Sequence, residues 1–272
     1  MKLRLISLLL VIIIISATSG CSSTTNTNSK SIKIGSEEYS IQLTELSLMN
    51  KELKDSDIEN LKNMTSLKVL NLRSNRISDL SPLKVLTNLE VLHLSDNSIR
   101  DLSPLKGLIH LKTLSLNDNK LSDLKPLSGL SELTTLVLDG NHISDLSPLK
   151  DLVNLTDLYL DNNQISDLSP LHDLSHLTTL GLNNNHISDL SPLDNLSALT
   201  SLGLNKNEIS DLKTLGGLTN LKSLHLRSNS FSDLSPLKGL ADLTLLDLYG
   251  NQLKETQVSE IRAALLHCIV NY

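Results

Sequence analysis

Residues 67–86 read LKVLNLRSNRISDLSPLKVL, and this pattern of apolar and polar residues returns every 22 residues as far as Asp242. Eight units follow one another without an insertion or a deletion. They begin at Leu67, Leu89, Leu111, Leu133, Leu155, Leu177, Leu199 and Leu221. A fixed period of this length indicates a solenoid, in which a single unit cannot bury its apolar side alone and must stack on its neighbours.

Each unit contains a Leu-x-Leu stretch, such as Leu92-His93-Leu94. Alternation with a period of two is typical of a strand, in which successive side chains point to opposite faces. We therefore expect the leucines to fill the core. The intervening residues should face solvent from a parallel sheet that gains one strand per unit.

Two further positions recur in the part of each unit that follows the strand. Asparagine occupies the first, at residues 75, 97, 119, 141, 163, 185, 207, 229 and 251. Its amide can satisfy backbone groups that no strand pairing reaches, so the sequence predicts an internal asparagine ladder. Proline occupies the second, at residues 82, 104, 126, 148, 170, 192 and 236. Serine usually precedes it and is predicted to be an N-cap, with proline opening a short 3₁₀ turn on the convex side.

The two ends of the array have atypical sequences, as capping units of a solenoid require. Residues 32–41 are predicted to form a hairpin around Gly35-Ser36, followed by a degenerate first coil that is two residues longer than the others. Apolar residues at helical spacing within 255–267 predict a C-terminal helix, and residues 269–272 a last strand. The predicted organisation is a signal peptide (1–20), a tether (21–31), an N-terminal cap with the degenerate repeat (32–66), eight repeats (67–242) and a last partial repeat with a C-terminal cap (243–272).

The string Asn-x-Ile-Ser-Asp-Leu-Ser-Pro-Leu, as in residues 141–149, together with the 22-residue period, resembles the internalin-like branch of bacterial leucine-rich repeat proteins. The likeness covers about residues 43–253. It implies an α/β repeat solenoid, a right-handed array with a concave parallel sheet and 3₁₀ turns on its convex side. It also implies a non-catalytic interaction module. Internalins usually add an immunoglobulin-like cap and often a cell-wall sorting motif, which this sequence does not show, so host-cell invasion is not part of the expectation.

The first twenty residues have the pattern of an export signal. Lys2 and Arg4 precede an apolar run from Leu5 to Ile15, and small residues follow up to Gly20. A membrane-spanning helix needs about 20 apolar residues. The run is therefore too short to span, and a cleaved signal peptide is favoured over a retained anchor.

Cys21 follows the small residues directly, and Thr18-Ser19-Gly20-Cys21 resembles the bacterial lipobox, in which the cysteine is acylated after cleavage. Thr18 departs from the aliphatic residue usual at that position. The departure leaves open ordinary cleavage after Ser19, which would release a soluble protein. Lipidation is the preferred prediction because a polar tether follows the cysteine, and more than one acyl signal makes anchoring stable. The expected location is the bacterial cell envelope.

The charge balance argues against a polyanionic partner. Removal of residues 1–20 takes away Lys2 and Arg4 but no acidic residue, so the formal net charge moves from -6 to -8. Nucleic acid binding is therefore excluded as an expectation. Cys268 is the only cysteine besides Cys21, so no disulfide framework is expected. Cys268 itself is predicted to be a buried cap residue, not a reactive thiol.

No catalytic or metal site is predicted, and no cofactor. His142 and His186 share a turn position two coils apart, but Gln164 lies between them and no other ligand is at metal spacing. Aspartates recur at residues 79, 101, 123, 145, 167, 189, 211 and 233. They permit two interpretations: a ladder of carboxylates that collects cations, or local bonds to backbone amides at the start of each helical turn. The second is favoured.

Function is therefore expected on the solvent face of the sheet, where the repeat does not dictate the residue. Tyr159 lies between Asp157 and Asp161, and the bare Gly181 and Gly203 are expected to leave a recess beside it. Tyr159 is the predicted anchor, because aromatic residues carry much interface energy. The other candidates are Asp139, Val137, His93, Asn117, Asn183, His225 and Arg227. The alternative is that these are unselected solvent positions of a recently duplicated array.

The sequence thus predicts a lipid-anchored monomer that binds a partner protein through its concave face, as an adhesin or surface interaction protein. The middle of the concave face is acidic because it carries Asp139, Asp157 and Asp161, which favours a basic partner protein. A surface glycan is the alternative ligand. Two other functions stay open. One is a structural or assembly role among the bacterium's own envelope proteins, and the other is a hydrolase with an unrecognised site.

Overall fold

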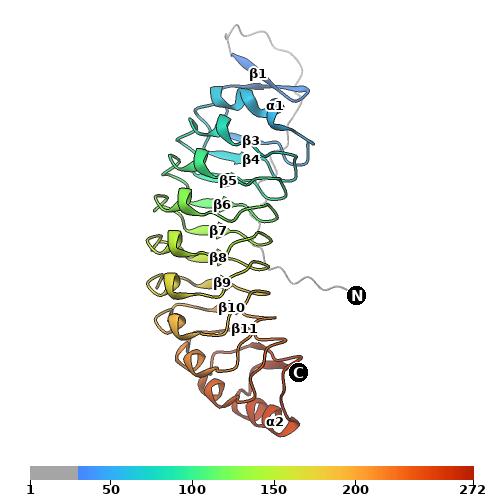
Figure 1. Cartoon of the computed structure of the whole chain (residues 1–272), viewed down its shortest axis with the longest axis vertical. Helices are drawn as coiled ribbons and strands as arrows, with labels where there is room; N and C mark the ends of the chain where they lie inside the picture. Colours follow the sequence, from blue (N-terminus) through green and yellow to red (C-terminus); the bar gives the residue numbers. More distant parts are fainter. Residues whose placement is uncertain (1–29) are drawn as a thin grey trace.

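The computed structural model describes residues 30–272 and shows a curved column of stacked coils (Figure 1). Each coil contributes one three-residue strand to a single 11-stranded parallel sheet, in which spatial order follows chain order. The strands are β3 Glu45–Ser47, β4 Val69–Asn71, β5 Val91–His93, β6 Thr113–Ser115, β7 Thr135–Val137, β8 Asp157–Tyr159, β9 Thr179–Gly181, β10 Ser201–Gly203, β11 Ser223–His225, β12 Leu245–Asp247 and β13 Ile269–Asn271. The predicted repeat solenoid is therefore confirmed.

The sheet register repeats the sequence period. Val69 pairs with Val91, which in turn pairs with Thr113, so neighbouring strands are offset by 22 residues. Glu45 of β3 instead pairs with Val69, an offset of 24 residues, because the first coil is two residues longer. Equivalent side chains therefore stand in columns, roughly 4.8 Å apart from one strand to the next.

The opposite side of each coil carries a short 3₁₀ helix. These are η1 Glu59–Asn63, η2 Ser81–Leu83, η3 Ser103–Leu105, η4 Lys125–Leu127, η5 Ser147–Leu149, η6 Ser169–Leu171, η7 Ser191–Leu193, η8 Lys213–Gly217 and η9 Ser235–Gly239. One detail of the prediction is wrong, because serine is not the N-cap of these turns. Ser81 is the first residue of its turn, and Asp79 Oδ1 accepts a hydrogen bond from its N–H at 2.8 Å. The aspartate two residues upstream is better placed, since its carboxylate reaches the free amide.

This bond recurs in all eight repeats. The carboxylates of Asp79, Asp101, Asp123, Asp145, Asp167, Asp189, Asp211 and Asp233 each accept from the backbone N–H two residues later, at 2.8 to 2.9 Å. The geometry supports the local interpretation of the aspartate series.

The core between sheet and turns is a continuous stack of leucines that are almost completely excluded from solvent. The predicted asparagine ladder runs beside it. Asn119 Nδ2 donates to the carbonyls of Leu94 and Leu116 at 3.0 Å, and Asn119 Oδ1 accepts from the N–H of Ile99 at 3.0 Å. Each amide therefore links adjacent coils. Every buried side-chain nitrogen and oxygen atom among residues 30–272 has a hydrogen-bond partner.

Both ends of the column are closed. The predicted N-terminal hairpin is present as β1 Ser31–Ile34 and β2 Glu37–Ser40, followed by the short helix α1 Asp55–Ile58. The C-terminal helix α2 Glu255–Ala264 ends three residues earlier than predicted. Cys268 lies half-buried against the core beyond it, and its burial raises the pKa of the thiol. No helix among residues 30–272 is long and apolar enough to cross a membrane.

Candidate binding surface on the concave sheet

The outward positions of the strands form the concave face, three columns of side chains that run along the solenoid. In β7 and β8 the first and third residues are half-buried while the leucine between them is buried. Val137 and Tyr159 therefore lie side by side in the middle column, in register on paired strands. The third column lies two residues beyond each strand.

The predicted recess beside Tyr159 is not there. Gly181 and Gly203 are both buried, since side chains of the preceding coils cover them. A Cβ atom at Gly181 would lie 3.5 Å from Tyr159 Cδ1 and 2.9 Å from an Asp161 carboxylate oxygen. The ring of Tyr159 thus rests on the bare backbone of Gly181 in the next coil, and the side chain of Asn183 covers Gly203 in the same way.

The third column contains a second hydrogen-bond ladder, which we call the concave ladder: Asp139, Asp161, Asn183, Asn205 and Arg227. In each step the side-chain Oδ1 accepts from the backbone N–H one coil further on. The distances are 2.7 Å (Asp139 to Asp161), 2.8 Å (Asp161 to Asn183), 2.8 Å (Asn183 to Asn205) and 2.7 Å (Asn205 to Arg227). Three of the predicted binding residues therefore also stabilise the stacking of coils. This role was not predicted, because the outward positions were expected to have no part in the stacking of coils.

The two acidic members of the concave ladder have raised pKa values. Burial, followed by repulsion from the Asp161 carboxylate, raises the pKa of Asp139 to about 7. Burial also raises the pKa of Asp161, against the lowering effect of its hydrogen bonds from Asn183. Near neutral pH this part of the face therefore holds less negative charge than its aspartates suggest.

The pKa of Tyr159 is raised as well, mainly by burial and then by the charge of Asp157. Asp157 belongs to the first column and receives a hydrogen bond from the Thr156 hydroxyl at 2.8 Å. Tyr159 thus lies among acidic side chains on the concave face, and its role as a binding anchor stays a prediction.

At the N-terminal end of the face, His93 Nδ1 lies 3.0 Å from Ser115 Oγ, and burial lowers the pKa of this histidine. Asn117 accepts a hydrogen bond from the Ser95 hydroxyl and donates to Asp118 at 2.8 Å. The polar groups here are joined to one another, so the surface is held in one arrangement before any partner arrives.

At the C-terminal end, His225 Nε2 lies 3.0 Å from Ser223 Oγ. Arg227 places its guanidinium 4.5 Å from the centre of the Tyr249 ring. Tyr249 was not among the predicted binding residues. The sequence does indicate this contact, because Tyr249 follows Arg227 by 22 residues and therefore occupies the same third-column position one coil later.

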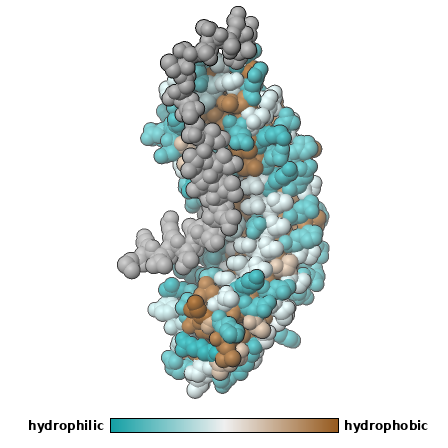
Figure 2. Space-filling view, turned by 180° about the vertical axis from the view of Figure 1, so that it is seen from behind, coloured by the Kyte–Doolittle hydropathy of each residue, from teal (hydrophilic) through white to brown (hydrophobic). Residues whose placement is uncertain are grey.

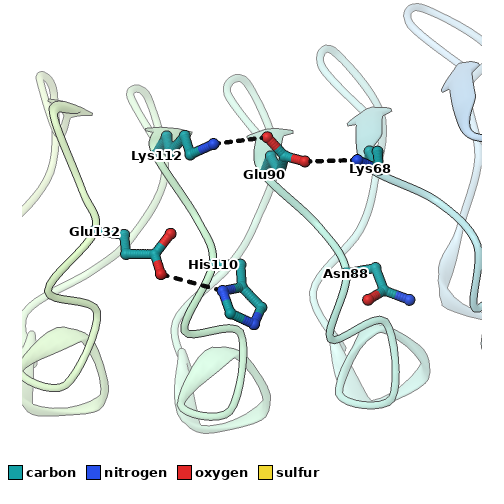
Figure 3. A pocket seen from close by; sticks show the side chains of 6 residues that line it. All are labelled: Lys68, Asn88, Glu90, His110, Lys112 and Glu132. Carbon is teal, nitrogen blue, oxygen red and sulfur yellow. Dashed lines mark hydrogen bonds and ion pairs between the residues drawn. The ribbon is translucent and has the colours of Figure 1, made fainter.

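A groove runs along the flank of the sheet, just before the strands begin (Figure 3). Glu90 accepts from Lys68 at 3.0 Å and from Lys112 at 2.9 Å, and these two lysines lower the pKa of Glu90 to about 2. Glu132 pairs with His110 at 3.2 Å. Because these charged side chains already pair with one another, the groove leaves few charged groups free to bind a ligand.

No group of three or more His, Cys, Asp or Glu residues within the described part of the chain could hold a metal ion. His186 faces Glu208 at 3.3 Å, and His172 faces Asp194 at 3.3 Å, so these histidines have local partners. The arrangement of the concave face suits recognition of another molecule.

Comparisons with known proteins agree with this architecture. Residues 87–132, 131–173, 175–217 and 219–262 match the family model "Leucine Rich repeats (2 copies)", and residues 63–80 match a single-repeat model. No curated protein matches the chain.

Several solved structures are similar. Internalin C2 from Listeria monocytogenes shares 44% identity over 65% of this chain and 78% of its own, with a TM-score of 0.63. An internalin (inlF) from the same organism shares 31% identity over 87% and 83%, with a TM-score of 0.62. A leucine-rich repeat protein from Leptospira interrogans shares 27% identity over 85% of this chain and 58% of its own, with a TM-score of 0.75.

Proposed function

The chain belongs to the leucine-rich repeat family and is internalin-like, and from this premise we propose that it binds a partner protein through its concave face while a lipid on Cys21 holds it at the bacterial cell envelope. In this role it is a non-catalytic surface interaction protein. The fold supports binding in general, and the particular residues of the concave face would select the partner.

One observation carries the binding proposal: the concave columns hold different side chains from coil to coil, whereas the core and turn positions repeat. Along the middle column, His93, Val137, Tyr159 and His225 stand on strands whose central residue is a leucine in each case. The outward strand positions therefore present different chemistry from coil to coil on a rigid frame, as recognition of a partner requires.

The internal bonds of this face add to the argument. The concave ladder fixes Asp139, Asp161 and Asn183 in one conformation, so little side-chain freedom is lost when a partner binds. The mildly acidic surface around Tyr159 favours a partner with basic residues at the rim and an apolar group over the ring.

Photo-crosslinking tests which face binds. A crosslinking residue replaces Thr179, a half-buried concave position on β9, and in a matched variant it replaces Lys150 on the convex side. The concave variant should capture the partner that the wild-type protein pulls down, and the convex variant should not. Capture from Lys150 alone would contradict the proposal.

The anchoring proposal rests on Cys21, which lies outside the described residues. Cys21→Ser should abolish labelling by a fatty-acid analogue and move the protein from the membrane fraction to a soluble or unprocessed form. Equal labelling of the variant would exclude a lipid at this position. Digestion by protease on intact cells would then distinguish a surface-exposed adhesin from a partner of internal envelope proteins.

A further inference from the structure

Arg227 and Tyr249 form a stacked pair at the C-terminal end of the concave face. The guanidinium lies 4.5 Å from the ring centre, and 55% of Tyr249 is exposed. The backbone of both residues is held, because Asn205 Oδ1 accepts from Arg227 N–H at 2.7 Å and Asp247 Oδ1 accepts from Tyr249 N–H at 3.3 Å. The pair therefore presents an oriented cation to solvent.

Within the described part of the chain, the guanidinium of Arg227 has no acidic partner. Among residues 30–272 no carboxylate oxygen lies within 4.0 Å of its nitrogens, whereas Arg73, the other arginine of the third column, is 3.4 Å from Asp96. A guanidinium has a planar fork of donors that matches a carboxylate, and stacking on a ring leaves the edges of that fork open. Arg227 is thus the concave arginine whose charge is available.

Apolar side chains occupy the opposite margin of the same end. Leu245 and Ile269 stand side by side in the first column on paired strands, and Ile269 is 66% exposed. Figure 2 shows one of the hydrophobic areas of the surface at this end of the molecule. Leu245 precedes Tyr249 by four residues, which corresponds to about 13 Å along an extended chain.

We propose that this end of the concave face is a subsite for an extended segment of the partner protein that carries an acidic side chain about four residues from an aliphatic one. The carboxylate binds the fork of Arg227 beside Tyr249, and the aliphatic group covers Leu245 and Ile269. The inference rests on the proposed function, in which the concave face binds a protein. It adds that the partner is bipolar, with basic residues over the acidic centre and an acidic one here.

Short peptides test the subsite without knowledge of the partner. Acetylated, amidated Leu-Ser-Ser-Ser-Glu and its reverse, Glu-Ser-Ser-Ser-Leu, are titrated against the purified protein, and the NMR signal of the Arg227 Nε–Hε group is followed. At least one of the two should give a saturable shift. Replacement of glutamate by lysine should abolish the shift, and replacement of leucine by serine should weaken binding several-fold, since the buried apolar area is lost.

Two variants locate the effect, and in both of them peptide affinity is followed from the backbone amide signal of Tyr249. Arg227→Gln should reduce affinity by about tenfold or more, because a hydrogen bond to a charged group is lost. Arg73→Gln removes the same charge at the paired arginine and should leave affinity unchanged. The proposal is overturned if the lysine peptide binds equally well, if Arg227→Gln has no effect, or if acetate alone at equal concentration gives the same shift and affinity.

This experiment can fail separately from the proposed function. If the peptides do not bind while crosslinking from Thr179 still captures the partner, the concave face binds a protein but Arg227 is not a carboxylate subsite. If neither occurs, the concave face itself has been assigned wrongly.

Discussion

Aspartates accept a backbone N–H on both faces of the solenoid, and the consequences for their pKa values are opposite. On the convex side, the bonds from Ser103 to Asp101 and from Ser191 to Asp189 lower the pKa of each carboxyl. On the concave side, Asp139 and Asp161 accept equally short bonds, yet their pKa values are raised. The same local interaction is therefore not enough to set the charge.

The difference lies in water and in neighbouring charge. The convex carboxylates are exposed to water, which screens neighbouring charges, so the hydrogen bonds dominate their pKa values. The concave pair is largely buried, so loss of hydration outweighs the bonds at both carboxyls, and repulsion from Asp161 raises the pKa of Asp139 further. The convex aspartates stabilise their turns without being buried. In the concave pair, the ionised carboxylates are destabilised by burial, and they lie on the face that we propose binds the partner.

The largest expected effect concerns the core that both faces share. Leu160 is fully buried between Tyr159 and Asp161 in the chain, with its side chain on the opposite side of the backbone. Leu160→Ala should reduce the free energy of unfolding by about 2 to 5 kcal/mol through the cavity that it leaves. Denaturant unfolding followed by circular dichroism measures the loss.

Leu266→Ala is the matched control, because this leucine is 80% exposed and its side chain contributes little buried apolar area to the core. It should change the free energy of unfolding by less than about 0.5 kcal/mol. Equal losses at the two positions would mean that stacking of coils on the leucine core does not hold the array together.

The second prediction separates binding from stability on the concave face. Tyr159→Ala should weaken binding of the captured partner by about 2 kcal/mol without unfolding the array, because the ring packs over Gly181 outside the leucine core. Titration calorimetry with the purified partner gives the difference in affinity.

The matching convex variant joins Lys150→Ala and His172→Ala, which remove side chains next to the 3₁₀ turns. It should leave binding unchanged. If this double variant abolishes binding while Tyr159→Ala has no effect, the functional surface lies on the convex side.

The third prediction tests the concave pair directly. Asp139→Asn keeps the Oδ1 acceptor for the Asp161 N–H, as Asn183 and Asn205 do in later coils, but it removes the charge. A shift from the ordinary pKa of 3.8 to about 7 corresponds to about 4 kcal/mol as an upper limit. Because the carboxyl keeps some contact with water, we expect Asp139→Asn to stabilise the fold by about 1 to 3 kcal/mol above pH 7.

The pH dependence follows from the direction of the shift. A carboxyl whose pKa is raised by folding stabilises the folded state while it is protonated, and this stabilisation is lost as pH rises from about 4 through 7. The benefit of Asp139→Asn should therefore be absent near pH 4 and complete above pH 7. Asp157→Asn removes a charge from the same face outside the ladder and should give a smaller, flatter change. A uniform gain at every pH for Asp139→Asn would contradict the assigned cause.

Most of the fold could be predicted from the sequence, because the residues that form the strand, the core and the turn recur at the same positions from unit to unit. The leucine alternation, the asparagine at residue 119 and its equivalents, and the Ser-Pro turns each have one physical solution. The turn cap was harder. Serine and aspartate both cap turns, and only the geometry showed that Asp79 reaches the amide of Ser81.

The candidate site was less predictable, because outward positions interact across coils. Nothing in the local sequence says that the side chain of Asp139 reaches the backbone of residue 161, or that the ring of Tyr159 covers Gly181. These contacts depend on the 22-residue register of paired strands combined with side-chain rotamers. The Arg227–Tyr249 pair could have been found by reading the third column as a stack of neighbours.

The smallest expected effect concerns the convex aspartates. Asp189 accepts from the Ser191 N–H at 2.8 Å and from the Ser191 hydroxyl at 2.9 Å. Asp189→Ala should reduce the free energy of unfolding by about 0.5 to 2 kcal/mol at neutral pH, as loss of a capping side chain does. Because these bonds lower the pKa of Asp189, its contribution is present above about pH 4 and is lost as pH falls further. The cost of the substitution should therefore disappear in acid, where the gain from Asp139→Asn disappears as well.

Calcium decides between the two interpretations of this series. If each convex aspartate only binds its own turn, the melting temperature of the wild-type protein should be the same with millimolar calcium and with a chelator, and Asp189→Ala should cost the same in both. Melting that rises with calcium, and loses this rise when Asp167, Asp189 and Asp211 are replaced together, would favour a ladder of cations. That result would also remove the contrast between the two faces, because the convex carboxylates would then be repelling one another until an ion neutralised them.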